Sequence, residues 1–185
     1  MKVFKYILIL LVVFLISGYF LVQNHSVQNK LFENTVRALF QTNEIFMNDA
    51  LSVAVCGSRA PLPSPNRAET CLLVQAGTSK FIIDTGRGSA DNLQKWRVDY
   101  SDLEAVILSH LHSDHISDLH EVQFQSWLGG RKTPLSVIGP IGTASTAQGF
   151  EQAFKLDSIY RSEHHGAILP LSLIHISEPT RHNSI

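Results

Sequence analysis

The sequence contains only two cysteines, Cys56 and Cys71, among its 185 residues, and it has no C-x-x-C pair. This absence excludes zinc-ribbon and thioredoxin-like sites, because both need closely spaced cysteines. The formal net charge is only −1, so composition offers no charge-based argument for nucleic-acid binding, although a local basic patch is compatible with it. No internal repeat is visible, and the length suffices for one domain with a hydrophobic core.

One short run is unusually rich in metal-binding side-chain types. Residues 109–115 read S-H-L-H-S-D-H and follow the apolar stretch 105–108. Imidazole and carboxylate groups are the nitrogen and oxygen ligands that suit zinc. A strand that ends in a sharp loop can turn alternate side chains toward one ion, while the next residues reach a second ion. A surface patch of histidines is the alternative, but such a patch would not need an aspartate in this register.

The H-x-H-x-D-H run resembles the signature of the metallo-β-lactamase fold superfamily. Asp84-Thr85-Gly86, after an apolar run, resembles the D-x-G of the same superfamily. The Gly/Pro-rich segment 56–68 resembles the first loop of the branch that contains ribonuclease Z and related arylsulfatases. The resemblance covers roughly residues 50–170. It implies the α/β fold class, as the N-terminal half of an αββα sandwich.

The resemblance also implies roles for individual residues. His110 and His112 would bind a first zinc ion, and Asp114 and His115 a second, with manganese or iron as alternatives for a carboxylate-containing site. Asp114 could also accept a proton from the attacking water. Asp84 would orient a ligand through a hydrogen bond. Two such ions would lower the pKa of water and polarise the scissile bond.

Asp84 has two other interpretations. D-T-G after an apolar run is also how an aspartic protease presents its carboxylate, but Arg87 follows here and a protease leaves the histidine run unexplained. Asp84 could also be a turn residue ahead of the glycines that follow it.

The branch resemblance implies hydrolysis of a small-molecule sulfate or phosphate ester, with a lactonase or β-lactamase as alternatives. Ribonuclease Z processes transfer RNA in the cytoplasm, and the N-terminal segment argues against that location, so no nucleic-acid partner is expected. The hydrolase is expected to be the longer parent protein, and this 185-residue chain, as a truncated form with a partial metal site, is expected to show no appreciable hydrolase activity. Further ligands would be expected after residue 170, and His164 and His165 are the late candidates before it.

The N-terminal 23 residues predict a transmembrane helix that acts as a signal anchor. Lys2 and Lys5 precede the uncharged apolar run 6–22, which is near the lower length limit for spanning a bilayer. The lysines favour a cytoplasmic N-terminus, which places the following domain outside the cytoplasm. A secreted form after signal cleavage is the alternative. Residues 24–49 predict a spacer with a helix.

The C-terminal residues 171–185 resemble the translation of a transposase adapter used in sequencing libraries, so we expect a non-native tail there. Between the two ends, periodicity predicts a series of short elements. Strands are expected at 50–55, 71–75, 80–84, 103–108 and 135–138, and helices at 90–96, from about 115, and at 143–154. His120 is expected at the polar surface. The two cysteines could form a disulfide or remain two buried thiols.

Overall fold

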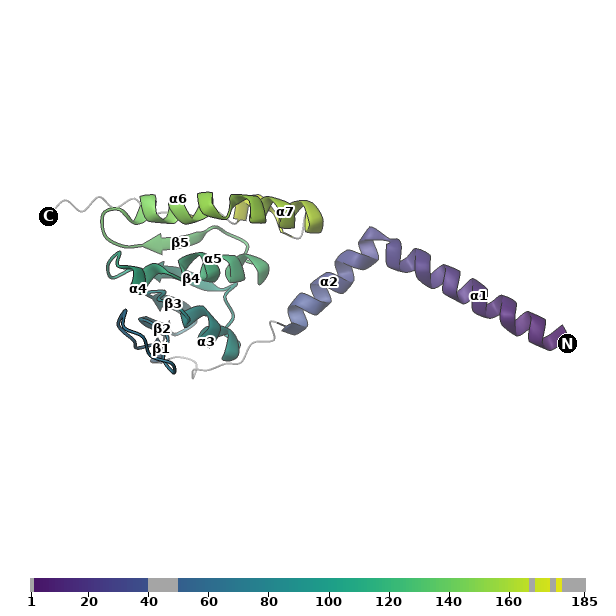
Figure 1. Cartoon of the computed structure of the whole chain (residues 1–185), viewed down its shortest axis with the longest axis horizontal. Helices are drawn as coiled ribbons and strands as arrows, with labels where there is room; N and C mark the ends of the chain where they lie inside the picture. The colour runs from purple at the N-terminus through teal and green to yellow at the C-terminus, as the bar shows by residue number, and fades with distance from the viewer. Residues whose placement is uncertain (1, 40–49, 167–168, 174–175, 178–185) are drawn as a thin grey trace. The chain divides into compact units, whose positions relative to one another are not determined.

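The structure is a computed structural model that describes residues 2–39, 50–166, 169–173 and 176–177 (Figure 1). The chain divides into two compact units, residues 1–39 and residues 40–185.

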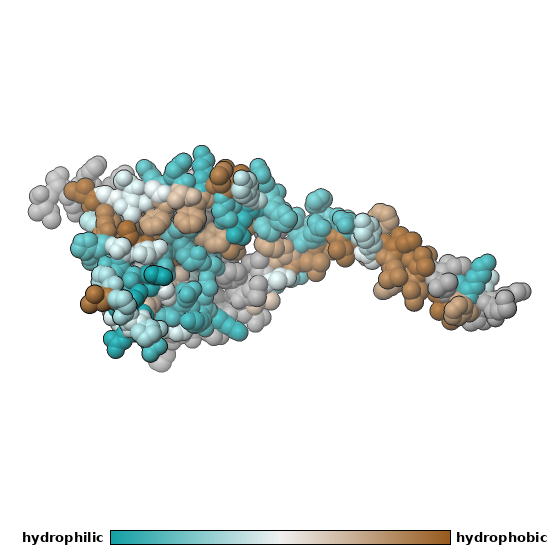
Figure 2. Space-filling model, viewed as in Figure 1, coloured by the Kyte–Doolittle hydropathy of each residue, from teal (hydrophilic) through white to brown (hydrophobic). Residues whose placement is uncertain are grey.

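The first unit consists of helices α1 (Lys2–Gln23) and α2 (His25–Leu39). The stretch Phe4–Gln23 is long and apolar enough to cross a membrane, as expected from the sequence, and a signal sequence would meet the same test. Its hydrophobic side chains form a largely brown surface in Figure 2. Asn24 lies between the helices, and its Oδ1 accepts a hydrogen bond from the Ser26 amide at 2.9 Å, which caps the start of α2.

The second unit contains a mixed sheet in which the strands lie in sequence order, from β1 to β6. The strands are β1 (Leu51–Gly57), β2 (Cys71–Ala76), β3 (Ser79–Ile83), β4 (Leu103–Ile107), β5 (Leu135–Ile138) and the two-residue β6 (Ile176–Ser177). Strands β1, β2 and β3 pair antiparallel, whereas β3, β4, β5 and β6 pair parallel. Hairpins followed by parallel strands with intervening helices confirm the predicted α/β class.

Five helices accompany the sheet (Figure 1) in the part of the chain that the structure describes. They are α3 (Ser89–Lys95), α4 (Ser113–Ile116), α5 (Leu119–Leu128), α6 (Thr143–Ala153) and α7 (Lys155–His165), and a 3₁₀ turn follows at Leu171–Leu173. The single helix expected from about residue 115 is in fact two helices, α4 and α5. His112 occupies the N-cap position of α4, and its side chain makes no capping hydrogen bond. Helix α7 was not anticipated.

The hydrophobic core lies between one face of the sheet and the helices. Cys71 and Leu73 of β2 are buried, and the residues that alternate with them are half-buried, as the two-residue period of a strand requires. The buried members of the other strands and of α3 and α5 complete one cluster, which includes Ile82, Leu93, Val106, Leu119, Val122 and Val137. Burial of a side chain of this size contributes about 1.5–3 kcal/mol, so this cluster fixes the strand registers.

The opposite face of the sheet is also apolar but less covered. The strand registers align one residue from each of five strands in a single row: Val55, Leu72, Ile83, Ile107 and Ile138. Val55 is 58% exposed and Ile138 is 42% exposed, and the three residues between them are half-buried. Within the described residues, this row forms a continuous hydrophobic stripe that is open to solvent at both ends.

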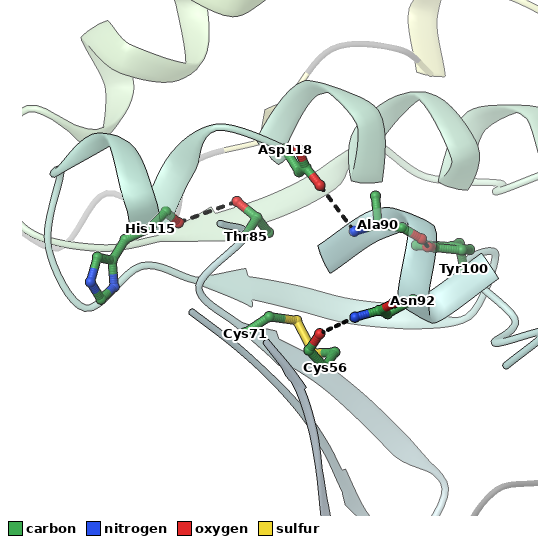
Figure 3. Close-up of a disulfide and its surroundings, with 8 residues drawn as sticks. All are labelled: Cys56, Cys71, Thr85, Ala90, Asn92, Tyr100, His115 and Asp118. Atoms are coloured by element: carbon green, nitrogen blue, oxygen red, sulfur yellow. Dashed lines mark hydrogen bonds between the residues drawn. A yellow bond between two sulfur atoms is a disulfide. The ribbon is translucent and has the colours of Figure 1, made fainter. Parts of the chain in front are cut away.

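A disulfide joins Cys56 to Cys71 (Figure 3), and it resolves the choice that the sequence left open. It connects the end of β1 to the start of β2, across the Gly/Pro-rich first loop. Asn92 of α3 donates a hydrogen bond to the backbone oxygen of Cys56 at 2.8 Å. The disulfide and this hydrogen bond together attach the first loop to the helix that follows β3.

Part of the segment expected to be a non-native tail pairs with the sheet. Ile176 and Ser177 of β6 lie beside Leu135 and Ser136 of β5 in parallel register. Residues 178–185 lie outside the described part of the chain, and the expected boundary at residue 171 stays a prediction.

Candidate metal centre

The candidate site forms where β3 and β4 end at the same edge of the sheet. The two strands are parallel neighbours, so their carboxyl ends lie side by side. Asp84 follows β3, and its amide donates to the backbone oxygen of Ile107 at 2.9 Å. The loop after β4 carries the H-x-H-x-D-H run, and the Leu108 amide donates to Ile138 at 2.7 Å. Sheet pairing therefore brings two segments that are distant in sequence to one place.

The four predicted metal ligands form two pairs of donor atoms. His110 Nε2 lies 3.1 Å from His112 Nδ1, and the two rings are nearly perpendicular, at 78°. His115 Nε2 lies 3.5 Å from Asp114 Oδ2. The ring centroids of His110 and His115 are 3.9 Å apart, so the two pairs are adjacent. These are the pairs that the sequence predicted for a first and a second ion.

Both separations suit zinc. Ligand nitrogens at about 2.0–2.1 Å from a tetrahedral zinc lie roughly 3.3 Å from each other, close to the 3.1 Å and 3.5 Å seen here. Each pair of donor atoms is spaced to contact one zinc ion. Within the residues described, no group of three or more His, Cys, Asp or Glu is arranged to hold a metal. The donor types and the paired spacing fit the expected ions, and the ligand roles themselves stay predictions.

Asp84 makes the contacts that its predicted orienting role requires. Its side chain is buried, and Oδ1 accepts the Ser109 amide at 2.8 Å. Oδ2 lies 2.8 Å from His115 Nδ1. An ionised carboxylate can only accept, so His115 carries its proton on Nδ1 and leaves Nε2 free for an ion. Asp84 itself has a φ of 60°, a left-handed conformation that aspartate adopts more readily than most residues.

The two residues after Asp84 contact the histidine loop, and Figure 3 shows the first of them, Thr85, beside His115. The Thr85 amide donates to the His115 oxygen at 2.7 Å, and the Asp118 amide donates to the Thr85 oxygen at 2.7 Å. Asp118 Oδ2 accepts the Ala90 amide at 3.0 Å, and burial raises the pKa of this carboxyl group. At Gly86, an added Cβ would lie 2.2 Å from the Asp114 oxygen, so only glycine fits. The turn formed by the D-T-G sequence therefore packs against the histidine loop and is hydrogen-bonded to it.

Sequence reasoning missed one residue of the site and misplaced one residue outside it. Ser109 was assigned no role, yet its hydroxyl contacts both Asp84 and His110. The signal for it was a hydroxyl directly before the first histidine. His120 was expected at the polar surface, and this is wrong: it is 8% exposed and its ring stacks on Phe154 at 3.6 Å. His120 is buried because Phe124, one turn further along α5, and Phe154, between α6 and α7, lie against its ring.

The late candidates His164 and His165 lie at the C-terminal end of α7. Their rings contact each other at 4.7 Å, and His164 is exposed. Burial lowers the pKa of His165. Their position on a helix after β5, rather than at a strand end, gives no support to a ligand role.

The mixed sheet and the H-x-H-x-D-H run after β4 are similar to those of metallo-β-lactamase-fold proteins. Residues 65–138 match the family model described as the metallo-beta-lactamase superfamily, and this match supports the superfamily for the chain. Similar curated proteins are the ribonuclease Z of Mycobacterium marinum and that of Mycobacterium bovis. Each is 38% identical over 133 residues, which is 70% of this chain and 48% of the relative. The chain therefore spans about half the length of the curated relatives it matches.

The fold is also seen in a solved structure. Human tRNase Z, short form, superposes with a TM-score of 0.51 at 21% identity, over 68% of this chain and 42% of that one. At this identity the likeness shows the fold alone.

The comparisons correct the expected partners. A small-molecule ester and no nucleic acid were expected, whereas the relatives are named as ribonucleases. Two arguments misled the prediction. The net charge describes the whole chain and says nothing of local surface charge. The N-terminal apolar segment bears on location and not on the chemistry of the substrate.

Proposed function

We propose that this chain carries zinc-binding residues of a hydrolase that cleaves phosphodiester bonds in RNA. The observation that carries the proposal is the pairing of His110 with His112 and of Asp114 with His115 at one sheet edge, beside the buried Asp84. The ribonuclease names of the similar curated proteins support RNA as the substrate class. These names favour a ribonuclease over an arylsulfatase among the enzymes of the branch that the sequence resembles.

Each residue has a distinct role in the proposed reaction. His110 and His112 would hold one zinc ion, and Asp114 and His115 would hold another, with manganese or iron as alternatives. Zinc supplies a lowered pKa for water and polarisation of the phosphodiester when it is bound. Asp114 is 7% exposed, and its carboxylate accepts the proton of the attacking water. Asp84 holds the His115 ring in the orientation that presents Nε2.

A cleavage assay tests this proposal. The purified chain, loaded with zinc, is incubated with an end-labelled RNA, and cleavage that a chelator abolishes would support the proposal and overturn the expectation that this chain is inactive. His112→Ala and Asp114→Asn should also abolish it, whereas His25→Ala, on the exposed surface of α2, is the matched control and should not. Cleavage that survives both site substitutions contradicts the proposed residues. No cleavage by the zinc-loaded chain contradicts hydrolysis by these 185 residues and favours the alternative of a non-catalytic chain with a partial metal site.

A second proposal concerns location. We propose that α1 anchors the chain in a membrane, with the second unit on the extracytoplasmic side; release after signal cleavage is the alternative. The length and hydropathy of Phe4–Gln23 support this proposal. Lys2 before this stretch and Lys5 near its start favour a cytoplasmic N-terminus.

A further inference from the structure

Ser109 lies at the point where Asp84 and the first histidine of the loop meet. It directly follows Leu108, the residue after β4, and its hydroxyl oxygen has three close polar neighbours. Oγ lies 2.7 Å from Asp84 Oδ2, 3.0 Å from His110 Nδ1 and 3.3 Å from His115 Nδ1. One hydroxyl therefore connects the buried carboxylate to a ring in each of the two donor pairs.

Counting protons assigns the direction of these hydrogen bonds. A serine hydroxyl has a single proton, and the Asp84 carboxylate, which can only accept, lies at the shortest distance. The Ser109 oxygen can then only accept from His110, so His110 carries its proton on Nδ1. The His115 Nδ1 proton is directed to Asp84 at 2.8 Å, which leaves the longer contact with Ser109 secondary.

The position of the His110 proton decides whether the first donor pair can hold a cation. His110 Nε2 faces His112 Nδ1 at 3.1 Å. With the proton on His110 Nδ1, the Nε2 lone pair is free to share an ion with His112. With the proton on Nε2, the two rings would instead form a hydrogen bond to each other, and this bond would compete with the ion.

We propose that Ser109 is a positioning residue that holds His110 in the Nδ1–H tautomer and so keeps its Nε2 available to zinc. The inference rests on the zinc site of the proposed function. It assigns to Ser109 an effect on the first donor pair, whereas Asp84 controls the second pair directly through His115.

The test measures tautomers and zinc affinity separately. Long-range proton–nitrogen spectra of the full chain, labelled with [¹⁵N]histidine and kept zinc-free in detergent micelles, report which nitrogen of each ring is protonated. We expect Nδ1–H for His110 and His115 in the unsubstituted chain. Ser109→Ala should move the His110 proton toward Nε2 and leave His115 unchanged, because Asp84 still accepts from His115. That unchanged signal also shows that the variant is folded.

Zinc affinity, measured by competition with a chromophoric chelator, should fall about 10-fold in Ser109→Ala. Ser109→Thr keeps the hydroxyl and should restore both the tautomer and the affinity. Ser145→Ala, an exposed serine of α6, is the matched control and should change neither. An Nε2–H tautomer of His110 in the unsubstituted chain, or an unchanged tautomer or affinity in Ser109→Ala, overturns the inference. Absence of RNA cleavage with the expected tautomers would overturn the proposed hydrolysis and leave the role of Ser109 standing.

Discussion

The Asp84 carboxylate lies 2.8 Å from Nδ1 of His115, a residue 31 positions further along the chain. The contact exists because β3 and β4 are parallel neighbours and both residues follow the carboxyl ends of these strands. The H-x-H-x-D-H run therefore does not form the candidate site alone. The geometry of this run depends on the end of β3, where the Asp84 carboxylate accepts hydrogen bonds from Ser109 and His115.

The first prediction concerns the charge of Asp84. Asp84→Asn keeps a residue that tolerates the left-handed φ of 60°, but it removes one of two acceptor oxygens that serve three donors. We expect zinc affinity to fall about 10- to 100-fold, measured by chelator competition. Asp102→Asn is the control, since that exposed carboxylate pairs with Lys80 at 2.7 Å. An equal loss in both variants would show a general effect of charge.

The second prediction concerns the close approach at Gly86. Gly86→Ala places a methyl group 2.2 Å from the Asp114 oxygen and 2.6 Å from Glu69 Cβ. The backbone must shift, so we expect the free energy of unfolding to fall by about 1–3 kcal/mol and zinc affinity to fall with it. Urea unfolding and chelator competition measure the two effects. Gly149→Ala in α6 meets no atom within 4 Å and should leave both values unchanged or raise stability slightly. Normal stability of Gly86→Ala would contradict the contact.

The third prediction concerns the disulfide. Cys56 and Cys71 are separated by 15 residues, and closing a loop of this length restricts the unfolded chain. Replacing both cysteines with alanine should lower the free energy of unfolding by about 3 kcal/mol, measured in urea. Adding a reductant should reproduce the loss in the unsubstituted chain and have no effect on the double variant. Equal stability with and without reductant would show that the bond does not form.

The fourth prediction concerns pH. Burial lowers the pKa of His120 from its ordinary 6.5, although Glu121 and Asp157 oppose the shift and Glu151 and Lys155 line the adjacent pocket. Above pH 7 the ring is neutral in both states and contributes no pH dependence. As the pH falls below about 6.5, the unfolded state takes up a proton that the folded state resists, so stability decreases.

The measurement is the free energy of unfolding between pH 7.5 and pH 5. His120→Phe keeps the stacking with Phe154 and should remove part of the decrease, at most about 1.4 kcal/mol for each pH unit. His25→Phe, at an exposed position of α2, should leave the slope unchanged. A slope that His120→Phe does not alter would assign the pH dependence to other groups.

The fifth prediction concerns α1. If Phe4–Gln23 spans a membrane, the chain should stay in the membrane fraction after alkaline carbonate washing. The outer layers of the cells are opened while the cytoplasmic membrane is left intact. A protease added from outside should then degrade the second unit. Replacing Leu11 and Phe14 with lysine should release the chain to the soluble fraction, because each central charge costs about 2.5–3.5 kcal/mol. Protection of the second unit from the protease would place it on the cytoplasmic side.

Local patterns in the sequence predicted most elements of the fold. The strands at 71–75, 103–108 and 135–138 agree with β2, β4 and β5 to within one residue at each end, because alternation and β-branched residues mark them directly. Helix α7 was not predicted, although Leu156, Ile159 and Tyr160 have the i, i+3, i+4 spacing of an amphipathic helix in its otherwise polar sequence. The break between α4 and α5 was not predicted, because Ser117 and Asp118 are compatible with a continuous helix.

The site was predictable only where its residues are adjacent in sequence or match a known motif. His110, His112, Asp114 and His115 were recognisable together, and Asp84 through its D-x-G sequence. The contact of Ser109 with Asp84 and His110 depends on sheet pairing, which local patterns do not specify. The burial of His120 depends on Phe154, a residue 34 positions away, so it too required the tertiary structure.

The apolar row from Val55 to Ile138 has a practical consequence for how folding of this chain is judged. Dyes such as ANS fluoresce on exposed hydrophobic surface, and such a signal is commonly taken to indicate a molten globule. Val55 and Ile138 already expose 58% and 42% of their surface in the folded arrangement of the described residues. We therefore expect dye fluorescence from the folded sheet itself, and near-UV circular dichroism is the measurement that separates the ordered state from a molten one.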